Sequence, residues 1–145
     1  MKELCRKALI TALALAACLP APAQRSRIYS TAEGLPGSRI TEICQDRTGF
    51  IWIAGEDGLS RFDGREFQTM QPGGPGSGSI AGSQALSMLE DSHGRLWVGT
   101  ATGLQTFDPD EGIFKTVSSE YTSTIIEYTP GKGGGSEIWA GGGRH

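Results

Sequence analysis

The stretch GFIWIAGEDGLSRFDG, residues Gly49–Gly64, places an aromatic and aliphatic strand between glycine turns and follows it with a strand ending in Phe-Asp. A second stretch, GRLWVGTATGLQTFD at Gly94–Asp108, has the same organisation. At a fixed offset, seven residue types coincide: Asp46, Gly49, Trp52, Gly58, Leu59, Phe62 and Asp63 match Asp91, Gly94, Trp97, Gly103, Leu104, Phe107 and Asp108. The sequence is therefore built from a repeated unit.

The tryptophans mark the period of this unit, and a third copy follows around Trp139 in EIWAGG. Successive tryptophans are separated by roughly 42–45 residues, and an interval of roughly 40–45 residues is typical of propeller blades made of four short strands. The turns DRTG and DSHG begin with Asp and end with Gly, as type I turns favour. The strands after them are rich in aromatic and β-branched residues, which suit a buried pleated surface. We therefore expect an all-β fold of four-stranded antiparallel meanders.

The expected organisation is a signal peptide at 1–23, a lead-in segment at 24–37, blade 1 at 38–72, an interblade loop at 73–82, blade 2 at 83–120 and the start of blade 3 at 121–145. The proline and glycine content of Met70–Ser83 predicts a loop without regular structure. Repeat units cannot bury their apolar faces alone, so about two and a half blades leave one face open. We interpret the chain as the N-terminal fragment of a longer propeller protein, or as a disrupted reading frame.

The N-terminus has the features of an export signal. Three basic residues precede the apolar run Ala8–Leu19, which is too short to cross a bilayer as a permanent helix. The small residues Ala21–Ala23 form a cleavage site, whereas Leu15–Cys18 resembles the bacterial lipoprotein box, which would leave Cys18 lipidated. We favour cleavage after Ala23, so the expected location is the periplasm.

Charge and cysteine content argue against a nucleic-acid-binding protein and against a fold held by disulfides. The chain has 13 Lys and Arg against 16 Asp and Glu, and three of the basic residues lie in the leader. Without a basic patch, the electrostatic attraction that dominates nucleic-acid binding is missing. Cys44 is the one cysteine outside the leader, so the exported part has no internal disulfide. We expect Cys44 to be a small buried apolar residue.

The aligned residues resemble the two-component regulator propeller repeat, whose pattern runs D-x-x-G-x-hydrophobic-Trp-hydrophobic-G-Thr-x-x-Gly-Leu-x-x-hydrophobic-Asp. The second copy follows this pattern from Asp91 to Asp108. The first copy departs from it at Ala54-Gly55, and the third lacks the Asp-x-x-Gly turn in its usual place. The lead-in TAEGLPGSRITEI, Thr31–Ile43, resembles the start of the first blade in such sensors.

The resemblance implies part of the extracytoplasmic sensor of a Bacteroidetes-type hybrid two-component histidine kinase. Such a sensor would recognise an oligosaccharide, and the full-length inner-membrane protein would be a homodimer that passes the signal to downstream domains. Those domains lie outside this sequence, so this chain itself is not expected to be an enzyme. Two alternatives remain open: the propeller part of an exported polysaccharide-degrading enzyme, and a non-functional gene fragment.

No group of residues predicts a catalytic, cofactor or metal site, and the ligand-binding residues are not identified by the sequence. The Met70–Ser83 loop is the nearest candidate, because propellers bind ligands through loops on one face. Trp52 and Trp97 could be sugar platforms, but their position between aliphatic neighbours favours packing. His93 is interpreted as a turn residue, and Asp108–Gly112 as a solvated hairpin tip instead of a calcium loop. Three other sets are rejected: Gly76–Ala81 as a dinucleotide fingerprint, Gly131-Lys132 as a phosphate loop, and Glu56, Asp57 and Glu90 as hydrolase carboxylates.

Overall fold

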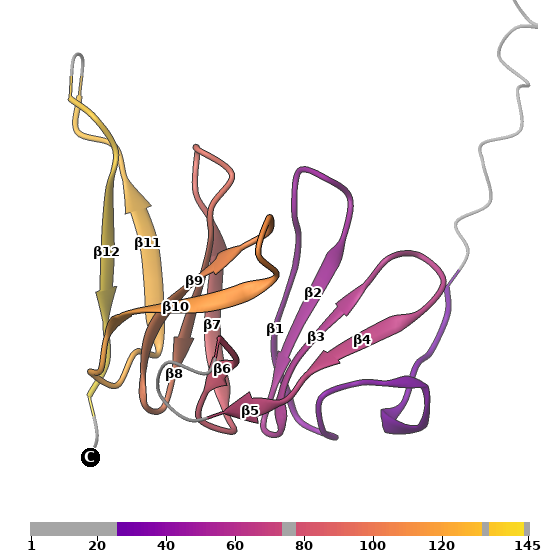
Figure 1. The fold of residues 1–145 in the computed structure, drawn as a ribbon. Coiled ribbons are helices and arrows are strands. Elements are labelled where there is room, and N and C mark those ends of the chain that lie inside the picture. The colour runs from indigo at the N-terminus through magenta and orange to yellow at the C-terminus, as the bar shows by residue number, and fades with distance from the viewer. Residues whose placement is uncertain (1–25, 74–77, 132–133, 144–145) are drawn as a thin grey trace, which may run out of the picture.

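The computed structural model describes residues 26–73, 78–131 and 134–143. Three antiparallel sheets stand side by side in chain order, two of four strands and one of two. Figure 1 shows them as a fan, with the first strands β1, β7 and β11 as neighbours. The expected all-β fold of four-stranded meanders is confirmed. The expected signal-peptide helix lies outside the described residues.

The first sheet is a meander of β1 (Ile40–Gln45), β2 (Ile51–Gly55), β3 (Gly58–Phe62) and β4 (Phe67–Met70). The second repeats it with β7 (Ala85–Glu90), β8 (Leu96–Thr100), β9 (Gly103–Asp108) and β10 (Ile113–Ser118). The third sheet consists of β11 (Thr124–Tyr128) and β12 (Glu137–Gly141). Gly49 and Gly94 have φ of 97° and 81°, which glycine adopts without strain, and this explains the glycine that ends each first hairpin turn.

The segment between the two large sheets differs from the expectation. Met70–Ser83 was expected to lack regular structure, but β5 (Pro72–Gly73) and β6 (Ile80–Ala81) form a short parallel pair. The side chain of Gln105 supplies the reason, because its amide oxygen accepts from the Ala81 N–H and its amide nitrogen donates to the Ser79 carbonyl. These contacts attach the segment to β9 of the second sheet. Glycine and proline shorten the pairing but do not prevent it.

The lead-in lies against the first sheet. Ser30 and Glu33 form a capping box around the single turn of 3-10 helix η1 (Thr31–Glu33), which ends at Gly34 with φ of 117°. Before this turn, the Tyr29 ring lies 5.4 Å from that of Phe62 and 5.2 Å from that of Phe67. The lead-in is therefore a folded part of the first unit.

Two apolar clusters join the three sheets. The larger one contains Trp52, Ala54 and Leu59 of the first sheet and buried residues of the second. The smaller joins Trp97 and Leu104 to Ile125 of the third sheet. Trp52 and Trp97 are 1% and 9% exposed, so both indoles pack between sheets. Cys44 packs partly buried against the larger cluster, and burial, followed by the nearby carboxylates, raises its pKa to about 11.

Among the described residues, no helix has the length and apolar character needed to span a bilayer.

The departure from the repeat pattern at Ala54-Gly55 has a steric cause. A methyl group at Gly55 would lie 2.0 Å from the carbonyl oxygen of Pro36. In the second copy the close approach falls one residue earlier, where a methyl group at Gly99 would lie 2.6 Å from the Thr122 carbonyl oxygen. In each copy, glycine therefore stands at the strand position that another chain segment touches, which is Gly55 in the first copy and Gly99 in the second.

We expect Gly55→Ala to lower the free energy of unfolding by about 1–3 kcal/mol, the usual cost of overpacking. Urea denaturation measures this difference. Gly135→Ala is the control, because nothing lies within 4 Å of an added methyl group there. Equal stability of the two variants would contradict the close packing of the lead-in on β2.

Candidate functional site

One carboxylate organises the first hairpin turn of the first sheet. Asp46 Oδ1 accepts hydrogen bonds from the backbone N–H groups of Thr48 and Phe50, each at 3.0 Å. Its other oxygen, Oδ2, accepts from the indole Nε1 of Trp52 at 2.8 Å. Asp46 therefore fixes the turn and the tryptophan together.

The second sheet repeats this arrangement. Asp91 Oδ1 accepts from the backbone N–H groups of His93 and Arg95, each at 2.9 Å, and Oδ2 accepts from Trp97 Nε1 at 2.9 Å. Arg95 Nε also lies 3.3 Å from Asp91 Oδ2. Sequence reasoning assigned Asp to the turn but missed its bond to the indole. The signal was present, because Asp and Trp recur together at the same separation.

Hydrogen bonds hold both carboxylates in the charged form. Burial acts to raise the pKa of Asp91, but the indole N–H of Trp97 and the backbone N–H groups of Arg95 and His93 outweigh it, so the pKa lies below its usual range. The pKa of Asp46 is lowered in the same way, with burial opposed by Thr48, Trp52 and backbone N–H groups. The turns therefore carry negative charges that already accept hydrogen bonds from the turn and from the indole.

The third copy lacks this arrangement. The strand register shows this, because Glu127 pairs with Ile138 in the same way as Glu90 pairs with Leu96. The residue after Glu127 is Tyr128, whereas the residue after Glu90 is Asp91. The Tyr128 ring lies edge-on to Trp139 at 6.0 Å, and the Trp139 indole donates to Glu137 Oε2 at 3.2 Å. Trp139 is 58% exposed.

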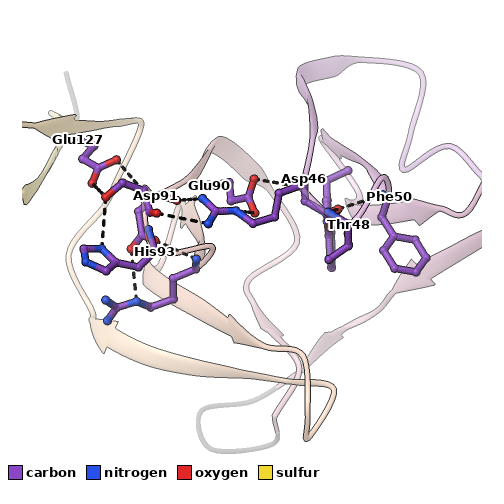
Figure 2. A network of polar contacts seen from close by, with 11 residues as sticks. Asp46, Thr48, Phe50, Glu90, Asp91, His93 and Glu127 are labelled. Carbon is purple, nitrogen blue, oxygen red and sulfur yellow. Dashed lines mark hydrogen bonds and ion pairs between the residues drawn. The ribbon is translucent and has the colours of Figure 1, made fainter.

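The β1–β2 turn and the β7–β8 turn each also bind the next sheet (Figure 2). Arg47 donates from its backbone N–H to Glu90 Oε2 and from Nε to Glu90 Oε1, each at 3.0 Å. Its Nη2 donates to the Asp91 carbonyl at 2.7 Å. One sheet later, Ser92 donates from its N–H and Oγ to Glu127, at 2.8 and 2.6 Å. The hydroxyl hydrogen bonds from Ser92 and Ser136 lower the pKa of Glu127. A polar link between neighbouring sheets therefore occurs twice, in addition to the apolar contacts.

A cavity of about 360 Å³ lies beside these turns, between the first and second sheets. The guanidinium of Arg61 lies 4.5 Å from the centre of the Phe50 ring and also faces Trp52 and Phe107. Its Nη2 donates to Gln68 Oε1 at 2.7 Å, and among the described residues no carboxylate lies within ion-pair distance of it. His93 and Pro109 complete the opposite wall. The cavity thus contains an aromatic surface with a cation whose charge is not neutralised.

The structure separates several residues considered from the sequence. Glu56 accepts hydrogen bonds from Ser38 and Arg39 beside the β2–β3 turn, whereas Glu90 binds Arg47 at the other end of the sheets. Asp57 is an exposed neighbour of Glu56. Glu90 therefore does not form a pair with Glu56 or Asp57.

The turn candidates have local partners. Asp108 accepts from the N–H groups of Asp110 and Glu111 and from Lys115 Nζ, which matches the expected hairpin tip. His93 is an exposed turn residue with its Nδ1 3.3 Å from Ser92 Oγ, and it also lines the cavity beside Arg61. Among the residues that the structure describes, no cluster of three His, Cys, Asp or Glu side chains could hold a metal ion.

The loop expected to bind ligand lies elsewhere. The described parts of Met70–Ser83 border a cavity of about 210 Å³, near Thr102 and the β8–β9 turn. Figure 1 places β5 and β6 at the opposite end of the sheets from the β1–β2 and β7–β8 turns. The role of this loop stays a prediction.

The pattern of the two component regulator propeller matches residues 34–57 and 79–102. Each match includes an Asp turn and its tryptophan, the geometry described above. Two segments of the chain are thus similar to the two component regulator propeller repeat. The two matched segments begin before β1 and β7, so each repeat includes the lead-in residue that packs on its sheet, Leu35 in the first and Ile80 in the second.

Among solved structures, the propeller repeats are similar to the extracellular domain of BT3049 from B. thetaiotaomicron, a protein assigned as a hybrid two component system. The similarity has a TM-score of 0.65 and 25% sequence identity, and it covers 79% of this chain. The chain spans 17% of the length of that solved chain. No protein of curated function matches the sequence.

The Asp turn of the second propeller repeat gives a pH test. The pKa of Asp91 in the folded chain lies below its unfolded value of about 3.9. Asp91 therefore stabilises the fold above about pH 3.9, and this stability is lost as the pH falls through the folded-state pKa. We expect Asp91→Asn to lower the free energy of unfolding at pH 7 by about 1.5–3 kcal/mol, the worth of a hydrogen bond to a charged group. Below about pH 4 its difference from the unchanged chain should shrink.

Urea denaturation at pH values between about 3 and 7 measures this difference. Asp110→Asn, at an exposed position of the β9–β10 turn, is the matched control and should follow the unchanged chain. If Asp91→Asn lost no stability at neutral pH, the carboxylate would not hold the indole and the turn.

Proposed function

We propose that this chain is part of an extracytoplasmic sensor of a two-component system, which recognises a ligand and regulates a downstream signalling module. The observation that carries the proposal is the coincidence of the two family matches with the two Asp–Trp turns. The similarity to a solved extracellular domain supports a location outside the cytoplasm, and the leader expected at 1–23 would direct export to the periplasm. In the full-length protein the signal would pass to a histidine kinase, which would act as a homodimer.

The cavity between the first two sheets is the proposed ligand site. Its volume of about 360 Å³ falls in the range of small-molecule sites, roughly 300–1,000 Å³. Aromatic side chains suit the apolar faces of sugar rings. Arg61 adds donors that match a carboxylate, which guanidinium groups bind in a forked geometry.

These features favour an acidic oligosaccharide as the ligand. Asp46 and Glu90 also border the cavity, but their oxygens are already hydrogen-bonded to the turn, to Trp52 and to Arg47. Arg47 also borders the cavity but is paired with Glu90, so Arg61 is the cavity's arginine without a carboxylate partner among the described residues. Because the cavity lies between two sheets, an occupied site would contact both and could change their packing, which is a means of transmitting the signal.

Isothermal titration calorimetry of the full chain with galacturonate oligomers, and with neutral xylose oligomers for comparison, tests this function. We expect the acidic oligomers to bind more tightly, and Arg61→Met to weaken their binding by about tenfold or more, since a charged hydrogen bond is worth about 1.5–3 kcal/mol. Arg39→Met, at an exposed arginine before β1, is the matched control. Binding of neither oligomer by the folded chain would contradict the proposal, and binding unaffected by Arg61→Met would contradict the site.

A further inference from the structure

A second cavity, of about 530 Å³, adjoins the proposed ligand site. The two cavities share Phe50 and Arg61 in their walls. From these residues the proposed site continues to the second sheet, whereas the second cavity continues along the first sheet to the β3–β4 turn and β4. Its other lining residues are Asp63, Glu66, Phe67 and Gln68. We call it the outer cavity, and we call the cavity of about 360 Å³ between the sheets the inner cavity.

The shared wall lies on the face of the first sheet that meets the second. Trp52 pairs with Arg61, which pairs with Gln68, and directly paired residues of neighbouring strands point to the same face. Trp52 on this face packs against buried residues of the second sheet. The boundary between the two cavities is therefore formed inside the contact of two neighbouring four-stranded sheets.

The guanidinium of Arg61 stands where the two cavities meet. Its Nη2 donates to Gln68 Oε1 at 2.7 Å, and its carbon lies 4.5 Å from the centre of the Phe50 ring. These contacts fix the position of the group. Its other nitrogens have no hydrogen-bond acceptor among the described residues. Arg61 therefore has donors left for a ligand that extends through both cavities.

The outer cavity carries carboxylates at the β3–β4 turn. Asp63 Oδ1 accepts from the backbone N–H groups of Arg65 and Glu66, at 2.7 and 2.8 Å. The N–H groups of Glu66 and Arg65 lower the pKa of Asp63, so this carboxylate is charged at neutral pH. Glu66 is exposed, and no donor among the described residues reaches its carboxylate. The outer cavity thus offers negatively charged acceptors beside the rings of Phe50 and Phe67.

The inner cavity has the opposite balance of charge. Asp46 and Glu90 in its walls already accept hydrogen bonds from within the protein. Arg61, in contrast, has no carboxylate partner among the described residues. A ligand anion is therefore favoured in the inner cavity and disfavoured in the outer one, where it would lie beside groups of like charge. Sugar hydroxyls instead donate charge-assisted hydrogen bonds to carboxylates.

We propose that the two cavities together bind an oligosaccharide in which a uronic acid unit is linked to a neutral sugar unit. The uronate carboxylate binds Arg61 from the inner cavity, and hydroxyls of the neutral unit donate to Asp63 and Glu66 in the outer cavity. The amide nitrogen of Gln68 donates to a sugar oxygen between them. This inference rests on the proposed function and narrows its ligand from an acidic oligosaccharide to a mixed one.

Isothermal titration calorimetry of the full chain with three tetramers tests the proposal. One is a xylose trimer that carries a single glucuronic acid, one consists of galacturonic acid alone, and one of xylose alone. We expect the mixed tetramer to bind about tenfold or more tightly than the galacturonate tetramer, because it supplies a carboxylate for Arg61 without placing another beside Glu66. The xylose tetramer should bind most weakly.

Variants of Glu66 test the role of its charge. Glu66→Gln keeps the size of the side chain but removes the charge, so the preference for the mixed tetramer over the galacturonate tetramer should decrease. Glu66→Lys should reverse the preference, because a cation in the outer cavity attracts a second uronate. Asp57→Lys is the matched control, since it changes the net charge equally at an exposed position of the β2–β3 turn, and it should keep the original preference.

The outcomes separate this inference from the proposed function. A galacturonate tetramer that binds more tightly than the xylose tetramer, and at least as tightly as the mixed one, would overturn the inference and leave the proposed function standing. A preference that Glu66→Lys leaves unchanged would also overturn it. If the folded chain bound none of the three tetramers, both would be wrong. Circular dichroism checks that each variant keeps its sheets, and Glu66→Gln decides the matter if Glu66→Lys does not.

Discussion

The hydrogen bond from a tryptophan indole to a turn aspartate is the interaction on which the rest of this fold depends. Asp46 and Asp91 each join a hairpin turn to the indole that fills the space before the next sheet. A buried carboxylate is costly unless its oxygens are bonded, and here the turn N–H groups and the indole N–H supply the partners. The same bond fixes the indole orientation, and therefore the surface that the following sheet meets. In the third copy Tyr128 stands at this position, and the Trp139 indole donates to Glu137 instead.

The polar links between sheets place the candidate ligand site. Arg47 crosses from the first turn to Glu90, and Ser92 crosses from the second turn to Glu127, so the turns of neighbouring sheets are held at a fixed separation. The cavity lined by Arg61 lies between these two sheets, beside the turns. Trp52 and Phe107 in its walls are residues of the repeat. Phe50 and the uncompensated Arg61 guanidinium belong to the first copy alone, because Arg95 and Thr106 stand at the equivalent places in the second. Arg61 thus adds a binding group to sheets whose arrangement is determined by the turns and the links between them.

The fold could be predicted from the sequence because its signals are local and occur twice. Tryptophans between aliphatic residues, turns beginning with Asp and ending with Gly, and a constant period each indicate a four-stranded unit. The bond from Asp to the indole was missed because Asp alone accounts for a type I turn, and turn chemistry assigns it no second partner. The β5–β6 pair was missed because Gln105, distant in sequence, supplies the hydrogen bonds that its glycines and prolines cannot. The cavity could not be found from the sequence, since Arg61 meets Phe107 only after two sheets pack together.

The groove lined by Leu35, Ile43, Ile53 and Phe62 on the first sheet matches, one repeat earlier, the surface of the second sheet on which Trp52 packs, and this repetition has an evolutionary consequence. Each repeat unit carries both a projecting face and the recess that accepts it, so duplicating the unit in the gene supplies a matching interface at once. Blade number can then change by copying or deleting whole units without redesigning any contact. The unit to be copied starts before its first strand, at Leu35 or Ile80, because that residue belongs to the recess.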